Sequence, residues 1–351
     1  MGAMEGGEGH FREVTLPGGA DRGRALRVQA RLKGGRYEII DVLADGGMGV
    51  LFRARDHRVG GNLVLIKAVK YDMSQFGFDR QRALYHVYSM RQRFKREKNV
   101  LMEMAHRGMN QVPAINDFFC DRNPELEREL PFGRFEDAEV MTLTGRSMAV
   151  ALSAEPYIVM ERIYGQSVRQ IMDHVSEARL LEIARSVCRL LERLHRPRGR
   201  PDGSDLSFIY MDLKPDNLIL DGHGGVWLVD FGAAIPVVDG VRQGKGAYTP
   251  GFAAPEVRRI GHPGATVDHR VDLYSLGAIL YQGFSKAHID PMTCATPFED
   301  EHPVLDLGLL RPDIHPLTRQ IVATALARAP EARYKAAPEM RRAIEAALRE
   351  V

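Results

Sequence analysis

Apolar and polar residues alternate, or form short apolar runs, through much of the first half of the chain. Segments with this pattern are expected as strands: 37–43, 51–55, 63–69, 115–119 and 157–160. One segment, 91–104, has the 3.6-residue period of a helix, with Phe94, Glu97, Leu101 and Met104 on one face. The pattern predicts a strand-rich first part with one marked helix.

The second half of the chain has the period of helices. Apolar residues recur every three or four positions in the segments expected as helices: 180–194, 271–284, 317–327 and 338–348. Residues 1–34 are rich in Gly and Arg with weak periodicity, so we expect a flexible tail. The change of period predicts an α+β protein with a β-rich part over 35–163 and a helical part over 164–351.

Two connectors are unusually long for a compact domain. The segment 121–155 separates two expected strands and has a hairpin-like pattern around Thr144 and Gly145, while 197–205 is polar. Both are expected as surface insertions. The first is either a plain decorated loop or a surface that binds a partner.

Composition excludes some classes of function. The chain has 351 residues, 44% hydrophobic and 27% charged, with a net charge of +2, which gives no indication of nucleic-acid binding. Cys120, Cys188 and Cys294 form no CxxC pair, so neither a disulfide framework nor a zinc site is expected. No apolar run reaches membrane-spanning length. We expect a cytoplasmic protein, or the cytosolic domain of a longer one.

Charged residues within apolar patterns are the first sign of chemistry. Lys67 ends the apolar run 64–67, and Glu97 lies in the apolar stripe of the helix 91–104. A buried charge requires a partner, so we expect these two to pair. Lys67 could instead extend its ammonium group to water at a strand edge. Arg91 and the other basic residues around Glu97 are interpreted as a solvated face.

Two short motifs carry the strongest indication of function. Asp212, Lys214 and Asn217 lie within one turn-like segment, and Asp230-Phe231-Gly232 follows shortly after. Phosphoryl transfer requires a group that orients a hydroxyl, a cation near the moving phosphate, and oxygen ligands for Mg²⁺. Glycines at 46, 47 and 49 allow a backbone to approach phosphates. Each motif alone could be an ordinary turn, but together and in this order they indicate phosphoryl transfer.

The chain resembles the Hanks-type, eukaryotic-like Ser/Thr protein kinases, most closely the bacterial members, from about residue 35 onward. The resemblance rests on the motifs above together with Thr249, Ala254-Pro255-Glu256, Asp272 and Arg333. It implies a two-lobed kinase fold with a β-rich N-lobe and a helical C-lobe. It also implies that Asp272 holds the catalytic-loop backbone and that Arg333 pairs with Glu256.

The resemblance also implies a role for each candidate site residue. Asp212 is the catalytic base, Lys214 neutralises the γ-phosphoryl group, and the Lys67–Glu97 pair orients the phosphates. Asn217 and Asp230 are the implied ligands of Mg²⁺, with Mn²⁺ as an alternative. ATP is expected to contact the following residues: Gly46, Gly49, Leu51, Leu65, Lys67, Met160, Glu161, Ile163 and Ile219.

Several positions depart from the family pattern. Ala44 replaces a glycine, Tyr210 a histidine, and Leu65 an alanine that lies over adenine, which predicts a crowded nucleotide pocket. Met211 replaces the arginine that binds a phosphate on the activation segment. Residues 232–247 contain no Ser, Thr or Tyr. The chain is therefore expected to be active without phosphorylation of that segment.

The sequence favours a protein Ser/Thr kinase that acts on a protein hydroxyl. A pseudokinase scaffold is the alternative, favoured by Leu65, Met211 and the insertion. A small-molecule kinase is the third hypothesis, although Lys214, Thr249 and 254–256 favour a protein substrate.

Overall fold

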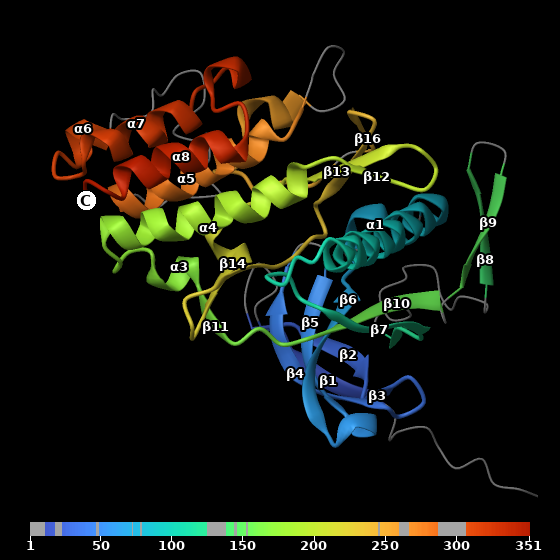
Figure 1. Ribbon diagram of the computed structural model, residues 1–351. Coiled ribbons are helices and arrows are strands. Elements are labelled where there is room, and N and C mark those ends of the chain that lie inside the picture. Colours follow the sequence, from blue (N-terminus) through green and yellow to red (C-terminus); the bar gives the residue numbers. More distant parts are fainter. Residues whose placement is uncertain are drawn as a thin grey trace, which may run out of the picture. The chain divides into compact units, whose positions relative to one another are not determined.

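The computed structural model describes residues 11–17, 23–46, 49–71, 73–77, 79–124, 138–143, 146–151, 154–244, 246–259, 267–286 and 307–351 (Figure 1). The chain divides into two compact units. Unit 1 comprises Met1–Met102 and Ala114–Arg162, and unit 2 comprises Glu103–Pro113 and Ile163–Val351. Among the described residues, no helix is both long and apolar enough to cross a membrane.

Unit 1 is built on a six-stranded antiparallel sheet with the order β3-β4-β5-β6-β10-β7. Its strands are β3 (Arg31–Leu32), β4 (Tyr37–Asp45), β5 (Gly49–Asp56), β6 (Asn62–Val69), β7 (Ile115–Asp121) and β10 (Glu155–Met160). Helix α1 (Arg80–His106) begins eleven residues before the predicted helix, at Arg80 rather than at Arg91. All five strands predicted for this part of the chain are present.

Strand β6, at the centre of the sheet, has apolar residues on both faces. In β6, Leu65 and Val69 belong to a core that includes α1, whereas Val64, Ile66 and Ala68 belong to a second core. Side chains of a strand alternate between the faces of a sheet, so both faces must be covered. The apolar run of β6, interrupted by Lys67, is typical of such a strand.

A β-hairpin supplies the cover of the second face. Strands β1 (Phe11–Thr15) and β2 (Ala25–Gln29) pair antiparallel, and Val14, Leu16 and Leu26 enter the second core with at most 6% exposure. The expectation of a flexible tail is therefore wrong for these strands. The apolar surface they bury stabilises them, but five-residue strands beside glycine-rich sequence give a weak periodic signal.

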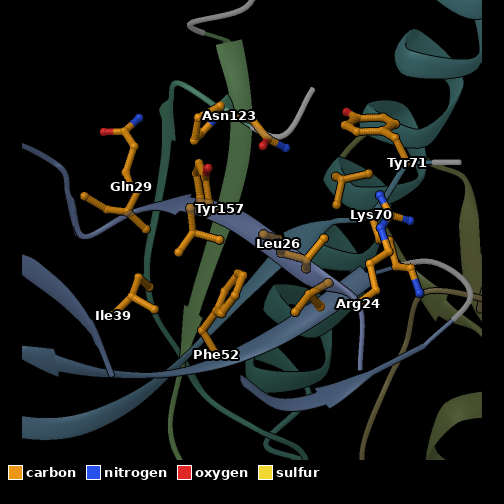
Figure 2. Close-up of a pocket in the computed structure, with 15 residues that line it drawn as sticks. Arg24, Leu26, Gln29, Ile39, Phe52, Lys70, Tyr71, Asn123 and Tyr157 are labelled. Atoms are coloured by element: carbon orange, nitrogen blue, oxygen red, sulfur yellow. The ribbon is translucent and has the colours of Figure 1, made fainter. Parts of the chain in front are cut away.

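A small cavity lies between this hairpin and the sheet (Figure 2). Leu26 of β2, Ile39 of β4 and Phe52 of β5 are among the side chains that line it. Its volume of about 30 Å³ is too small for an organic ligand. We interpret the cavity as imperfect packing rather than as a binding site.

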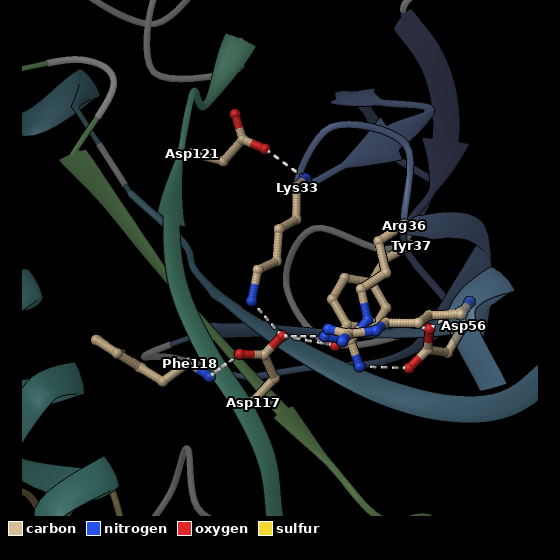
Figure 3. A network of polar contacts seen from close by, with 8 residues as sticks. Lys33, Arg36, Tyr37, Asp56, Asp117, Phe118 and Asp121 are labelled. Atoms are coloured by element: carbon tan, nitrogen blue, oxygen red, sulfur yellow. Dashed lines mark hydrogen bonds and ion pairs between the residues drawn. The ribbon is translucent and has the colours of Figure 1, made fainter.

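A polar network fixes the chain where the six-stranded sheet begins (Figure 3). Lys33 Nζ, Arg36 Nη1 and Tyr37 Oη all donate to Asp117 Oδ2 of β7, at 2.6, 3.0 and 2.7 Å. Burial acts to raise the pKa of Asp117, but hydrogen bonds from Lys33 and Tyr37 outweigh it and hold that pKa below its usual value. Arg36 also pairs with Asp56 at 2.9 Å.

The insertion between β7 and β10 contains a separate antiparallel hairpin. It is formed by β8 (Ala138–Leu143) and β9 (Arg146–Ala151). The hairpin pattern read from the sequence is confirmed in these two strands. Its predicted turn, Thr144 and Gly145, lies outside the described residues.

Unit 2 is mainly helical. Its helices are α3 (Val168–Ile171), α4 (Glu177–His195), α5 (Arg270–Ser285), α6 (Leu307–Leu310), α7 (Pro316–Ala325) and α8 (Ala337–Ala347). Helix α4 packs against α5 and α8, and α7 packs against α5 and α8. All helices predicted for this part of the chain are present, although α7 and α8 each end one or two residues early.

Two small antiparallel sheets complete unit 2, with the orders β11-β14-β15 and β12-β13-β16-β17. Their strands are β11 (Gly165–Ser167), β12 (Arg198–Gly199), β13 (Asp205–Ile209), β14 (Leu218–Asp221), β15 (Val226–Leu228), β16 (Ile235–Val238) and β17 (Val241–Arg242). Residues 103–113 also belong to this unit. Arg107 ties them to it by donating to the carbonyls of Arg196 and Leu206 at 3.0 and 2.6 Å.

Candidate active site

The predicted pair of Lys67 and Glu97 is present in unit 1. Lys67 Nζ donates to both carboxylate oxygens of Glu97, at 2.6 and 2.8 Å. Strand β6 supplies the lysine and helix α1 the glutamate, whose side chain is only 3% exposed. Because both charges are withdrawn from water, each requires the other. The pair can present one ammonium group in a fixed orientation.

Glycines are required where β4 turns into β5. Gly46 N donates to Gly49 O at 2.9 Å, which closes the turn. A Cβ atom on Gly49 would lie 2.7 Å from the carbonyl oxygen of Ala68, so only glycine allows β5 to approach β6 this closely. Gly47 and Met48, the rest of the predicted glycine-rich loop, lie outside the described residues.

The residues expected beside adenine in unit 1 lie on neighbouring strands. Leu65 of β6 is directly opposite Met160 of β10, and both are 7% exposed within the core that includes α1. Leu51 of β5 packs against the same core. Glu161 follows β10, where its amide donates to Ala114 O and its carboxylate accepts from Ala114 N.

The catalytic-loop residues form a compact cluster in unit 2. Lys214 Nζ donates to Asp212 Oδ2 at 2.7 Å and to Thr249 Oγ1 at 3.0 Å. Thr249 Oγ1 donates to Asp212 Oδ1 at 2.5 Å. A carboxylate, an ammonium group and a hydroxyl thus meet at one point. Asp212 can accept a proton or a hydrogen bond there, and Lys214 can neutralise a nearby anion.

The two predicted metal ligands are linked through the backbone. The side-chain Nδ2 of Asn217 donates to the backbone carbonyl of Asp212 at 2.9 Å. The backbone carbonyl of Asn217 accepts from the amide of Val229, the residue before Asp230, at 3.0 Å. An amide oxygen and a carboxylate are hard donors that suit Mg²⁺, which usually takes one or two protein ligands besides phosphate and water. The donor set therefore fits the ion. Ile219 lies on the adjacent strand β14.

A buried carboxylate holds the backbone of the catalytic loop. Asp272 of α5 is 0% exposed and accepts from the amides of Tyr210 and Met211, each at 2.8 Å. Met211 has a φ of +74°, which costs about 1–3 kcal/mol in a non-glycine residue. The two hydrogen bonds stabilise that conformation and so fix the direction of Asp212.

Sequence reasoning missed two residues that support these groups. His195 lies at the end of α4, and its Nε2 atom is 2.8 Å from Asp272 Oδ2. Arg91 of α1 was read as part of a solvated face, but its exposure is 6% and it contacts Glu155. A lone histidine or arginine at a helix face gives no signal of its partner. The pair of Arg333 and Glu256, by contrast, is present as expected, at 2.7 and 2.9 Å.

Comparison with known proteins agrees with these observations. A family model described as a protein kinase domain matches residues 132–300. A probable serine/threonine-protein kinase of Streptomyces coelicolor is 29% identical over 338 residues, which cover 91% of this chain and 41% of the relative. PknB of Mycobacterium tuberculosis is 29% identical over 324 residues, with 87% and 42% coverage. The chain spans about two fifths of the length of these curated relatives.

Solved structures show the same fold. The crystal structure of the Mycobacterium tuberculosis PknI kinase domain matches with a TM-score of 0.54 at 20% identity, covering 91% of this chain and 99% of that one. The α+β, two-lobed kinase fold expected from the sequence is confirmed. A protein kinase domain model thus matches part of the chain, and bacterial Ser/Thr protein kinases are similar to it over most of its length.

Proposed function

We propose that this chain transfers the γ-phosphoryl group of ATP to a Ser or Thr hydroxyl of a protein. The contact of Asp212, Lys214 and Thr249 carries the proposal. Asp212 orients the attacking hydroxyl and accepts its proton, while Lys214 neutralises charge on the transferred group. Lys67, oriented by Glu97, binds the α- and β-phosphates. This mechanism requires Lys67 of unit 1 and the pair of Asp212 and Lys214 of unit 2 to act on the same nucleotide. That arrangement stays a prediction.

A divalent metal ion, Mg²⁺ or Mn²⁺, would be held by Asn217 and Asp230. When bound, it neutralises phosphate charge and orients the triphosphate. Asp230 has a φ of +62°, so its backbone is strained in the way common at functional sites. Gly232 N donates to Asp230 Oδ1 at 3.3 Å and helps to orient that carboxylate.

We propose further that activity does not depend on phosphorylation of the activation segment. Strand β16 of that segment pairs with β13 at four positions, including Ile209 opposite Ile235. A Cβ atom on Gly246 would lie 3.1 Å from Met211 Cγ and 2.8 Å from Ile235 Cδ1. Backbone pairing and apolar contacts of Met211 thus hold the activation segment. In the family pattern, an arginine at the position of Met211 binds a phosphate on that segment instead.

Labelled ATP, Mg²⁺ and a generic basic protein provide the test of transfer. Asp212→Asn should reduce the transfer rate about 10²- to 10⁴-fold with little change in ATP affinity. Asp202→Asn is the matched control, because Asp202 belongs to the same unit but its side chain is 57% exposed. ATP binding without transfer by the wild type would instead support the pseudokinase alternative.

Phosphate mapping of the active enzyme tests whether activity is independent of phosphorylation of the activation segment. Tyr248 and Thr249 are the nearest hydroxyls beyond residues 232–247, and Thr249 already contacts Asp212. We expect phosphatase treatment and Tyr248→Phe to leave the rate within about twofold of wild type. A phosphate on either residue whose removal abolishes activity would contradict the proposal.

A further inference from the structure

A buried polar cluster in unit 1 lies outside the residues used for phosphate chemistry. Glu155, the first residue of β10, is 0% exposed. Its carboxylate accepts from Tyr71 Oη at 3.0 and 2.8 Å and from Arg91 Nε at 2.9 Å, and Arg91 Nη2 lies 2.9 Å from Glu155 Oε2. Tyr71 and Arg91 are 4% and 6% exposed. The cluster is therefore almost fully withdrawn from water.

The cluster joins the sheet to the same helix that carries Glu97. Arg91 precedes Glu97 by six residues, or about 9 Å along the axis of α1. Tyr71 follows Lys67 by four residues, just beyond the end of β6. Helix α1 is thus attached to this part of the sheet at two levels, by Lys67–Glu97 and by the Tyr71–Glu155–Arg91 cluster. One attachment leaves a helix free to pivot, whereas two restrict its rotation and its axial position.

Stability alone is a poor explanation for this cluster. Withdrawing an arginine and a carboxylate from water costs several kcal/mol per ion, and apolar residues of similar volume are often as stable or more so. Burial raises the pKa of Glu155 to about 7, although Arg91 and Tyr71 act to lower it. What a hydrogen-bonded ion pair supplies, and apolar packing does not, is a defined direction, here from Arg91 Nε to Glu155.

We propose that Arg91 and Glu155 are positioning residues that set the place of α1 and thereby the geometry of the Lys67–Glu97 pair. Tyr71 supports them by donating to Glu155. The proposal rests on the kinase function proposed above. It predicts that the cluster contributes to the turnover rate to a greater extent than to the stability of the fold.

A double variant, Arg91→Met/Glu155→Leu, separates these two contributions. We expect its melting temperature to fall by no more than a few degrees, because no buried charge is left unpaired and only the Tyr71 hydroxyl loses its acceptor. We expect kcat to fall at least tenfold. Amide hydrogen exchange in the peptide around Glu97 should be at least tenfold faster, while exchange in β4 and β5 should not change. Arg91→Lys keeps the charge and should remain within about threefold of wild-type kcat.

The matched control is Arg36→Met/Asp56→Asn. This double variant removes another arginine–carboxylate contact of unit 1, between Arg36 and Asp56 at 3.1 and 2.9 Å, that does not involve α1 (Figure 3). It should leave exchange around Glu97 unchanged, whatever its effect on the melting temperature. Wild-type kcat and wild-type exchange in Arg91→Met/Glu155→Leu would overturn the proposal. If that double variant does not fold, a kcat of Arg91→Lys more than about threefold below that of the wild type would overturn it. If the wild-type protein transfers no phosphate, the proposed function fails, and the exchange measurement alone decides the positioning role.

Discussion

The catalytic loop of unit 2 and helix α1 of unit 1 each orient a functional carboxylate, but by different means. Asp212 directly follows Tyr210 and Met211, whose backbone amides are bound to Asp272 of α5 in the same unit. The side chain of Glu97 is held by Lys67, and its helix of 27 residues is held by packing. Backbone contacts leave few alternative conformations, whereas side-chain contacts can be exchanged. The comparison suggests that the loop is fixed and that α1 is the adjustable part.

Asp272→Ala should have the largest effect, because it removes the carboxylate that fixes the catalytic loop. Two buried amides lose their acceptor, and the strained backbone of Met211 can relax. We expect a loss of about 3 kcal/mol in unfolding free energy and a fall in kcat of about 100-fold, since small displacements of a catalytic group have effects of that size. Thermal unfolding and the ATP transfer rate measure the two quantities.

Ser275→Ala is the control for that variant. Ser275 is also buried in α5, and its hydroxyl donates to Val271 O at 3.0 Å. We expect a change of about 1 kcal/mol or less and no change in kcat. Near wild-type activity in Asp272→Ala would show that the loop maintains its conformation without the carboxylate.

The same contrast explains how far the sequence could predict the site. Asp212, Lys214 and Asn217 lie within six residues, so their motif predicts their contacts. The pair of Lys67 and Glu97 could be predicted because each is a charge in an apolar pattern. Arg91 could not, since its partner Glu155 is 64 residues away and begins a strand after a long insertion.

The fold shows a similar limit. Long or strongly periodic elements, such as β6 and α4, were predicted from their apolar pattern. The β1–β2 hairpin was not, because each of its strands has five residues and contributes only a few apolar side chains. The sequence signal available for this hairpin was the apolar run of β6, because a strand with two apolar faces requires other elements to cover both.

Glu155→Gln tests the attachment of α1, the adjustable part, through the pH dependence of the free energy of unfolding. The pKa of Glu155 is raised from 4.5 to about 7 by burial, so the folded protein retains a proton that the unfolded chain releases. The resulting stability is fully present below pH 4.5 and is lost as the pH rises through about 7. The shift corresponds to about 3 kcal/mol.

Thermal or urea unfolding between pH 4.5 and 8 gives the measurement. Other groups also titrate in this range, so the difference between wild type and Glu155→Gln is the quantity to follow. We expect the fall in stability over this range to be smaller in the variant by about 3 kcal/mol. Parallel curves would mean that Glu155 keeps the same charge throughout this pH range.

Tyr71→Phe should have the smallest effect and gives the finest test of the cluster. It removes only the hydroxyl that donates to Glu155, at a cost of about 1 kcal/mol. That hydrogen bond acts to lower the pKa of Glu155, so its loss should raise this pKa further and move the decline in stability to higher pH. Because Arg91 still pairs with Glu155, exchange around Glu97 should remain close to that of the wild type. Exchange as fast as in Arg91→Met/Glu155→Leu would instead show that Tyr71, anchored just beyond β6, carries the second attachment of α1, and that Arg91 only neutralises the charge.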